Sequence, residues 1–71
     1  MIKMYSENEA FKFLLQLVLK YVPPGELKND LIKATNEKHS KYVLSKLDEL
    51  GFKPNNQFEQ NVIKSAFFYA E

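Results

Sequence analysis

Residues 10–22, AFKFLLQLVLKYV, form an apolar stretch that strongly restricts how this chain can fold. Ten of the thirteen residues are apolar, and the three polar ones, Lys12, Gln16 and Lys20, recur at every fourth position. On an α-helix this spacing gathers them in one narrow stripe, because residues four apart lie on the same face. A helix that crosses a membrane needs about 20 apolar residues. The stretch therefore predicts an amphipathic helix with a broad apolar face, and we do not expect integral membrane insertion.

Both ends of this first helix carry recognisable signals. Ser6 followed three residues later by Glu9 forms a capping box, in which each side chain accepts a hydrogen bond from the other residue's backbone N–H. Pro23 ends the helix, because the residue before a proline is pushed out of helical geometry. We expect the first helix over residues 7–22.

The apolar face of this helix covers about two-thirds of its circumference. A domain of 71 residues builds only a small core, so we expect part of the face to contact a second copy of the chain. One flank of the face should lie in the chain's own core and the other in a subunit contact, giving a homodimer or a higher oligomer. The candidate interface residues are Leu15, Leu19 and Val22 on one flank and Phe13, Leu17 and Tyr21 on the other.

The middle of the chain has helical propensity throughout, but its apolar stripe changes direction. On one continuous helix the two groups of apolar residues would lie about 150° apart. The groups are Leu27, Leu31 and Ala34, and then Val43, Leu47 and Leu50. Thr35 and Asn36 stand between the groups and are good N-cap residues. We therefore expect two helices, over residues 25–34 and 37–50, with a break at Thr35 and Asn36.

Turn residues mark the end of the third helix and the start of a fourth. Gly51 followed by Phe52 is typical of a helix C-terminus, where glycine adopts the left-handed conformation and the next residue makes an apolar contact. Asn56 is an N-cap residue, and we expect the fourth helix over residues 57–70. These elements predict an all-α fold, a small bundle of three to four short helices that forms a single domain over residues 1–71.

The two sides of the fourth helix differ in polarity, with one exception. The apolar side contains Phe58, Val62, Ile63, Ala66, Phe67, Tyr69 and Ala70. The polar side contains Gln60, Asn61, Lys64 and Glu71. Phe68 falls among these polar residues, and an exposed aromatic ring is a candidate anchor for a protein partner.

The chain lacks the groups from which catalytic and metal sites are usually built. It has no Cys and one His, His39, which we expect at the edge of the apolar face of the third helix, near Tyr42 and Val43. A catalytic base needs a nucleophile and an orienting group, and no motif supplies them. We predict no catalytic residue, no cofactor, no metal site and therefore no enzyme activity.

The charge composition of the chain does not favour nucleic-acid binding. All ten basic residues are Lys, and the formal net charge is +1. Arg is the usual residue for base-edge and bidentate phosphate contacts, so nucleic acid is not the partner we expect first. The second and third helices could still form a helix-turn-helix unit, which leaves a DNA-associated helical regulator as an alternative.

Residues 37–71 loosely fit a two-helix pattern built around Gly51. The fitting residues are Lys41, Val43, Leu47, Gly51, Phe52, Phe58, Glu59, Val62 and Ala66. In these positions the chain resembles the soluble C-terminal part of LLH-type phage holins. The resemblance covers about half of the chain and implies a phage or prophage origin. The family's membrane span has no counterpart in the apolar stretches of this sequence.

These features predict a small non-enzymatic helical binding protein of phage or prophage origin. It would act by protein–protein interaction and self-association, with a protein partner that the sequence does not identify. A peripheral membrane or lysis accessory protein is a further alternative. The first ten residues, MIKMYSENEA, do not have the pattern of a signal peptide, so we expect a cytoplasmic protein.

Overall fold

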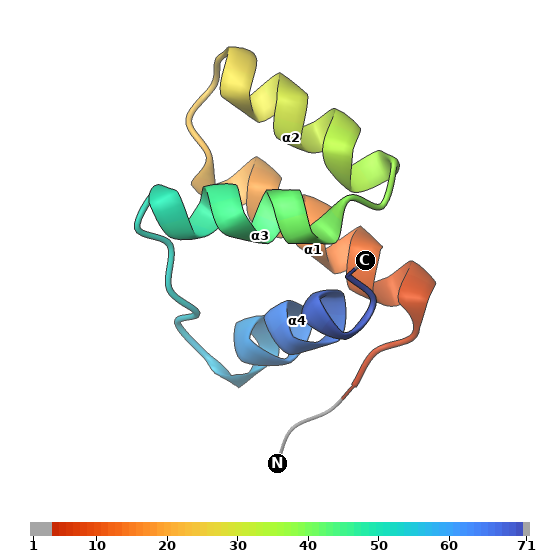
Figure 1. The fold of residues 1–71 in the computed structure, drawn as a ribbon. Coiled ribbons are helices and arrows are strands. Elements are labelled where there is room, and N and C mark those ends of the chain that lie inside the picture. Colours follow the sequence, from red (N-terminus) through yellow and green to blue (C-terminus); the bar gives the residue numbers. More distant parts are fainter. Residues whose placement is uncertain (1–3, 71) are drawn as a thin grey trace.

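The computed structural model describes residues 4–70, which form four helices and no strand (Figure 1). This confirms the predicted all-α class. The helices are α1 (Glu7–Tyr21), α2 (Glu26–Asn36), α3 (Ser40–Glu49) and α4 (Gln57–Phe68).

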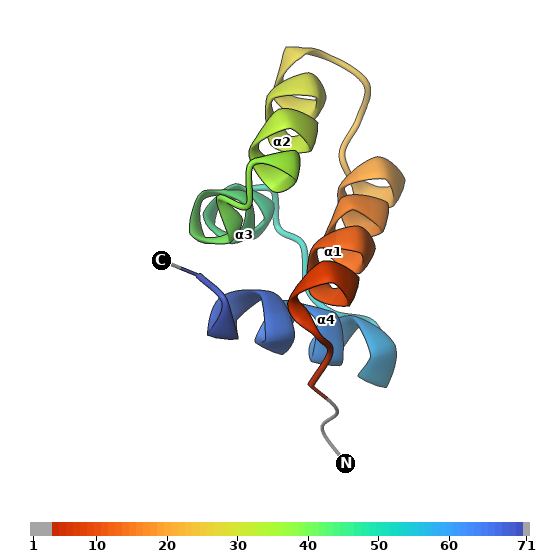
Figure 2. The ribbon, with the colours of Figure 1, turned by 90° about the vertical axis from the view of Figure 1, so that its right-hand side faces the viewer.

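The helices pack in a ring in which each contacts two neighbours. α1 packs against α2 and α4, and α3 packs against the same two helices from the other side. Figure 2 shows α2 at the top, α4 at the bottom, and α1 and α3 between them. All four helices contribute to the core, whose fully buried residues include Leu14, Val18, Leu31, Val43, Leu47 and Val62.

The N-terminus of α1 is capped as predicted. Ser6 Oγ accepts a hydrogen bond from the backbone N–H of Glu9 at 3.4 Å, and Glu9 Oε1 accepts one from the N–H of Ser6, also at 3.4 Å. The helix ends at Tyr21, and Val22 before Pro23 is extended. The predicted bounds of this helix are therefore right to within one residue, because both end signals act locally.

The predicted break between the second and third helices is wrong by about two residues. α2 continues through Thr35 and Asn36, and the chain turns only at residues 37–39. The Thr35 hydroxyl donates to the carbonyl oxygen of Leu31 at 2.7 Å, so it is satisfied inside α2 instead of capping α3. Thr35 is also buried, which keeps this turn of α2 against the core.

The ends of α2 and α3 share one hydrogen-bonding pattern, the Schellman motif. At the end of α3, Gly51 has φ +84° and the N–H of Phe52 donates to the carbonyl of Leu47 at 3.0 Å, as the sequence predicts. At the end of α2, the N–H of His39 donates to the carbonyl of Ala34 at 2.9 Å. Lys38 occupies the position equivalent to Gly51 and has φ +65°, which is unusual for a residue with a side chain.

The buried face of α4 differs from the predicted one. Asn56 caps the helix as expected, since its Oδ1 accepts from the N–H of Glu59 at 2.9 Å. Asn61, expected on the polar side, is buried and accepts a hydrogen bond from Gln57 Nε2 at 2.9 Å. Phe67, expected on the apolar side, is exposed. Glu71, also expected on the polar side, lies outside the described residues.

Candidate protein-binding surface

The predicted interface flanks of α1 are mostly covered by the chain itself. Leu17 and Val22, one from each flank, are each only 3% exposed and belong to the core, so they are not available to a second subunit. The flanks therefore do not divide into a core side and a subunit side. α2 and α4 cover more of the apolar face than the sequence suggested, because they pack on α1 from two directions.

The other flank residues are partly covered. Phe13 packs edge-on against Phe58 with ring centroids 5.2 Å apart, and Tyr21 packs against Phe52 at 5.0 Å. Leu15 is half-buried. Leu19 is 48% exposed and is the one predicted α1 residue that is open to solvent. Leu27 and Leu50, at the outer ends of the apolar groups of α2 and α3, are exposed as well.

Two adjacent rings at the end of α4 are the most exposed large apolar side chains among the described residues. Phe67 is 69% exposed and Phe68 is 70% exposed. The exposure of Phe68 agrees with its helical phase. Its ring meets that of Tyr69 edge-on at 5.1 Å, while the Tyr69 hydroxyl donates to the carbonyl of Tyr5 at 3.2 Å.

An apolar groove lies beside Phe67, between α3 and α4. It has a volume of about 180 Å³. Its lining residues are Leu44, Leu47, Asp48, Phe52, Pro54, Ile63 and Phe67. Leu44, Phe52 and Ile63 are only half-buried, so the groove joins the exposed Phe67 ring to a continuous apolar surface. We refer to Phe67 and this lining as the α3–α4 surface.

Sequence reasoning missed the α3–α4 surface apart from the neighbouring Phe68. The signal in the sequence is weak: consecutive residues on a helix point about 100° apart, so one of the adjacent rings Phe67 and Phe68 is expected to be exposed, but the helical pattern favours Phe68 for that place. Leu44 and Ile63 carry no such signal, because half-buried and fully buried apolar residues look alike in a helical pattern.

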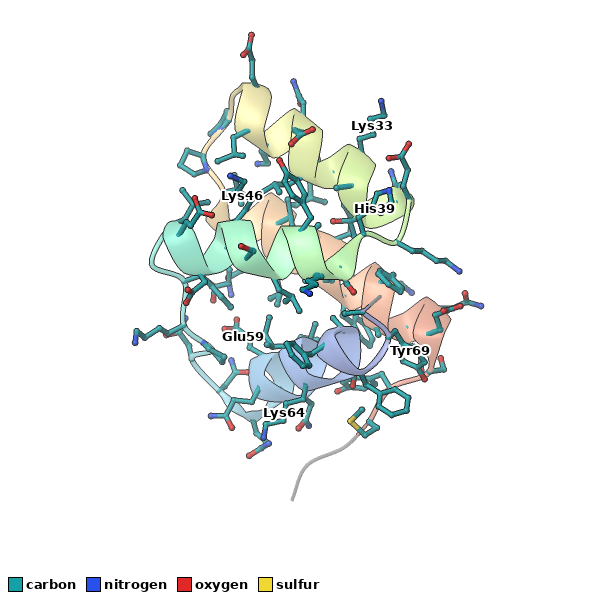
Figure 3. The ribbon with its side chains drawn as sticks, in the orientation of Figure 1. Lys33, His39, Lys46, Glu59, Lys64 and Tyr69 are labelled. Carbon is teal, nitrogen blue, oxygen red and sulfur yellow. The ribbon has the colours of Figure 1, made fainter. Side chains whose placement is uncertain are left out.

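A second and larger pocket, of about 600 Å³, lies between α2 and α3 and is lined by charged groups of both signs. Lys33, His39 and their neighbours lie on this side of the molecule (Figure 3). The Tyr42 hydroxyl donates to Asp30 at 2.5 Å, and this bond raises the pKa of Tyr42 above its usual value. With acidic Asp30 and Glu37 in its wall, the pocket is not a uniformly positive surface of the kind that binds phosphate.

His39 lies before α3 and not within it. It occupies the N-cap position, its side chain is exposed, and its Nε2 is 3.7 Å from Glu37 Oε1. Within residues 4–70 no group of three or more His, Cys, Asp or Glu side chains is placed to hold a metal ion.

Glu59 is a buried acidic residue that the sequence analysis named only within the two-helix pattern around Gly51. It is 2% exposed and comes from the first turn of α4 (Figure 3). Its carboxylate accepts from the Tyr21 hydroxyl at 2.6 Å and from the Asn55 N–H at 3.0 Å, with Lys20 Nζ at 3.9 Å. The hydrogen bond from Tyr21 lowers the pKa of Glu59 most, burial opposes that change, and Asn55 and Lys20 lower the pKa further. These contacts tie α1 to α4 and leave the carboxylate occupied by structural partners.

Comparison of the chain with protein-family models, with curated proteins and with solved structures found no match. Across residues 4–70, none of the helices has both the length and the apolar character needed to span a membrane.

Proposed function

We propose that this chain is a non-enzymatic binding module that contacts a protein partner through the α3–α4 surface. The observation that carries the proposal is the exposure of Phe67, 69%, directly beside an apolar groove. Burial of an aromatic or large aliphatic side chain contributes about 1.5–3 kcal/mol, and the folded monomer gains little of this from Phe67. A contiguous apolar surface left in water is typical of an interaction site.

The shape of the surface also supports a protein partner. Phe67 is a rigid ring with two side-chain torsions, and the neighbouring Leu44 and Ile63 form the apolar wall around it. Binding hot spots usually consist of such an aromatic residue in an apolar surround. Asp48 at the edge adds a charged group, as expected for the polar rim of an interface. The phage or prophage setting rests on the sequence resemblance alone.

The test compares three versions of the chain as affinity baits in a lysate of the source cells. The variants are Phe67→Ser on α4 and Leu19→Ser on α1, and both replace an exposed apolar residue. We expect the wild type and Leu19→Ser to enrich the same protein, and Phe67→Ser to lose it. Circular dichroism of each bait controls for folding.

Two results would count against this surface. If Leu19→Ser loses the partner and Phe67→Ser keeps it, the contact lies on α1, as the sequence reading expected. If all three baits enrich the same proteins equally, the α3–α4 surface is not a binding site.

A further inference from the structure

Two charged residues on the exposed side of α3 lack an ion pair. Lys41 lies in the first turn of the helix and Asp48 in its last turn, and both are exposed. Within residues 4–70, neither takes part in an ion pair, whereas Lys46 on the same helix pairs with Glu49. Asp48 also stands at the negative end of the α3 dipole, where an acidic residue is unfavourable unless a cation compensates it.

Lys41 and Asp48 lie on the same side of α3 with apolar and small residues between them. They are seven residues apart, which is two turns or about 10 Å along the axis. Leu44 lies between them and, with Asp48, lines the α3–α4 groove. The exposed Ser45 is a small residue near the midpoint, and it lines the neighbouring α2–α3 pocket together with Lys41. Along α3 this face therefore carries a positive charge at one end, apolar and small side chains in the middle, and a negative charge at the other end.

We infer that the partner of the α3–α4 surface is a second copy of this chain, bound so that the two α3 helices pack antiparallel about a two-fold axis near Leu44 and Ser45. Rotation about that axis places Lys41 of each copy beside Asp48 of the other, so two Lys41–Asp48 pairs form and every one of the four charges gains a partner. It also places the positive N-terminus of one α3 near Asp48 of the other copy. A two-fold contact requires a self-complementary face, and a face with one cation and one anion at equal distances from its centre meets that requirement.

The apolar part of the contact comes from the α3–α4 surface. Leu44 lies at the centre, and Phe67 flanks α3 beside the groove. In the antiparallel arrangement the Phe67 ring of each copy becomes covered by the other. This inference rests on the proposed function, since it names the occupant of the same surface.

The experiment measures mass by light scattering after size exclusion, at tens of micromolar protein and low salt. We expect the wild type at twice the 8.3 kDa mass of the chain. Lys41→Asp and Asp48→Lys each place like charges together at both ends of the contact, so each should weaken the dimer about tenfold or more. The double variant Lys41→Asp with Asp48→Lys restores opposite charges and should recover the dimer.

Two controls separate this pairing from other effects. Lys12→Asp makes the same charge change on the exposed stripe of α1 and should leave the mass at that of the dimer. Circular dichroism should show every variant folded, because all three positions are exposed.

Three outcomes overturn the inference. If the wild type is monomeric, the partner of the α3–α4 surface is not a second copy of the chain. If the single variants remain dimeric, the contact lies elsewhere on the molecule. If the double variant does not recover the dimer, Lys41 and Asp48 do not pair reciprocally. None of these outcomes alone removes the proposed function, because a different protein captured by the wild type and lost with Phe67→Ser would still support it. The proposed function fails separately, when Phe67→Ser captures everything that the wild type does.

Discussion

The Tyr21 hydroxyl donates a 2.6 Å hydrogen bond to Glu59 Oε2 and so joins the last turn of α1 to the first turn of α4. Tyr21→Phe removes the donor and keeps the ring that packs on Phe52. A hydrogen bond to a charged group contributes about 1.5–3 kcal/mol, so we expect a loss of that size in urea unfolding. Tyr69→Phe is the matched control: it removes a 3.2 Å bond to an uncharged carbonyl, which should contribute about 1 kcal/mol. Equal losses for the two variants would contradict a special contribution from the Glu59 charge.

Glu59 also makes stability depend on pH. Its pKa is lowered from the ordinary value of 4.5, chiefly by the bond from Tyr21. Because the pKa of Glu59 is lower in the folded state than in the unfolded state, its contribution to folding stability is complete above the unfolded-state pKa. That contribution is lost as the pH falls through the folded-state pKa. We expect the wild type to lose stability below pH 4.5 more steeply than Glu59→Gln, as measured by urea unfolding at a series of pH values. Parallel curves for the two proteins would show that Glu59 does not titrate in this range.

Lys38 has the left-handed conformation at the end of α2, with φ +65°. This conformation is unfavourable by about 1–2 kcal/mol for a residue with a Cβ, so Lys38→Gly should stabilise the fold by about 1 kcal/mol. Lys38 Nζ also lies 3.1 Å from Glu7 Oε1, and loss of this exposed pair would mask part of the gain. The substitution is therefore made in a Glu7→Gln background, where thermal unfolding should report the backbone effect without the contribution of the ion pair. A decrease in melting temperature in that background would contradict this reading of the turn.

Ser40 and Ser65 are both fully buried but differ in their hydrogen bonds. Among the described residues, Ser40 Oγ is the one buried side-chain nitrogen or oxygen atom without a hydrogen-bond partner. Ser65 Oγ accepts from the backbone N–H of Tyr5 at 2.9 Å. Because an unpaired buried hydroxyl is unfavourable and Ala favours a helix, Ser40→Ala should stabilise the protein by about 1 kcal/mol.

Ser65→Ala is the matched substitution and should have the opposite sign. It should destabilise the protein by about 1–3 kcal/mol, because the Tyr5 N–H loses its acceptor in a partly buried position. Urea unfolding of both variants gives the comparison, and changes of the same sign would show that burial of the hydroxyl, not its hydrogen bonding, controls stability here.

The helix ends that depend on local signals could be predicted from the sequence. The capping box of Ser6 and Glu9, the stop at Pro23, the cap at Asn56 and the turn at Gly51 all occur as expected. Each of them works within three or four residues, because a helix terminus is satisfied by the backbone and side chains next to it in the chain. The fold class follows from these ends together with the helical periodicity between them.

The break between α2 and α3 shows where local signals stop being sufficient. Thr35 has the chemistry of an N-cap, yet its hydroxyl bonds inside α2 because the side chain is buried against the core. The turn moves on to residues 37–39, although Lys38 is strained there. Burial of the last turn of α2 outweighs the preference of a single capping residue.

The identity of the exposed surface depended on how the helices pack. The sequence supports a broad apolar face on α1 and an exposed Phe68, but it cannot show that α2 and α4 cover Leu17 and Val22. Nor can it show that Tyr21 reaches Glu59, 38 residues away, and makes a buried carboxylate favourable. The periodicity of a helix shows which residues share a face, whereas the neighbours that cover that face come from distant parts of the chain. The groove beside Phe67 exists only because α3 and α4 meet in space.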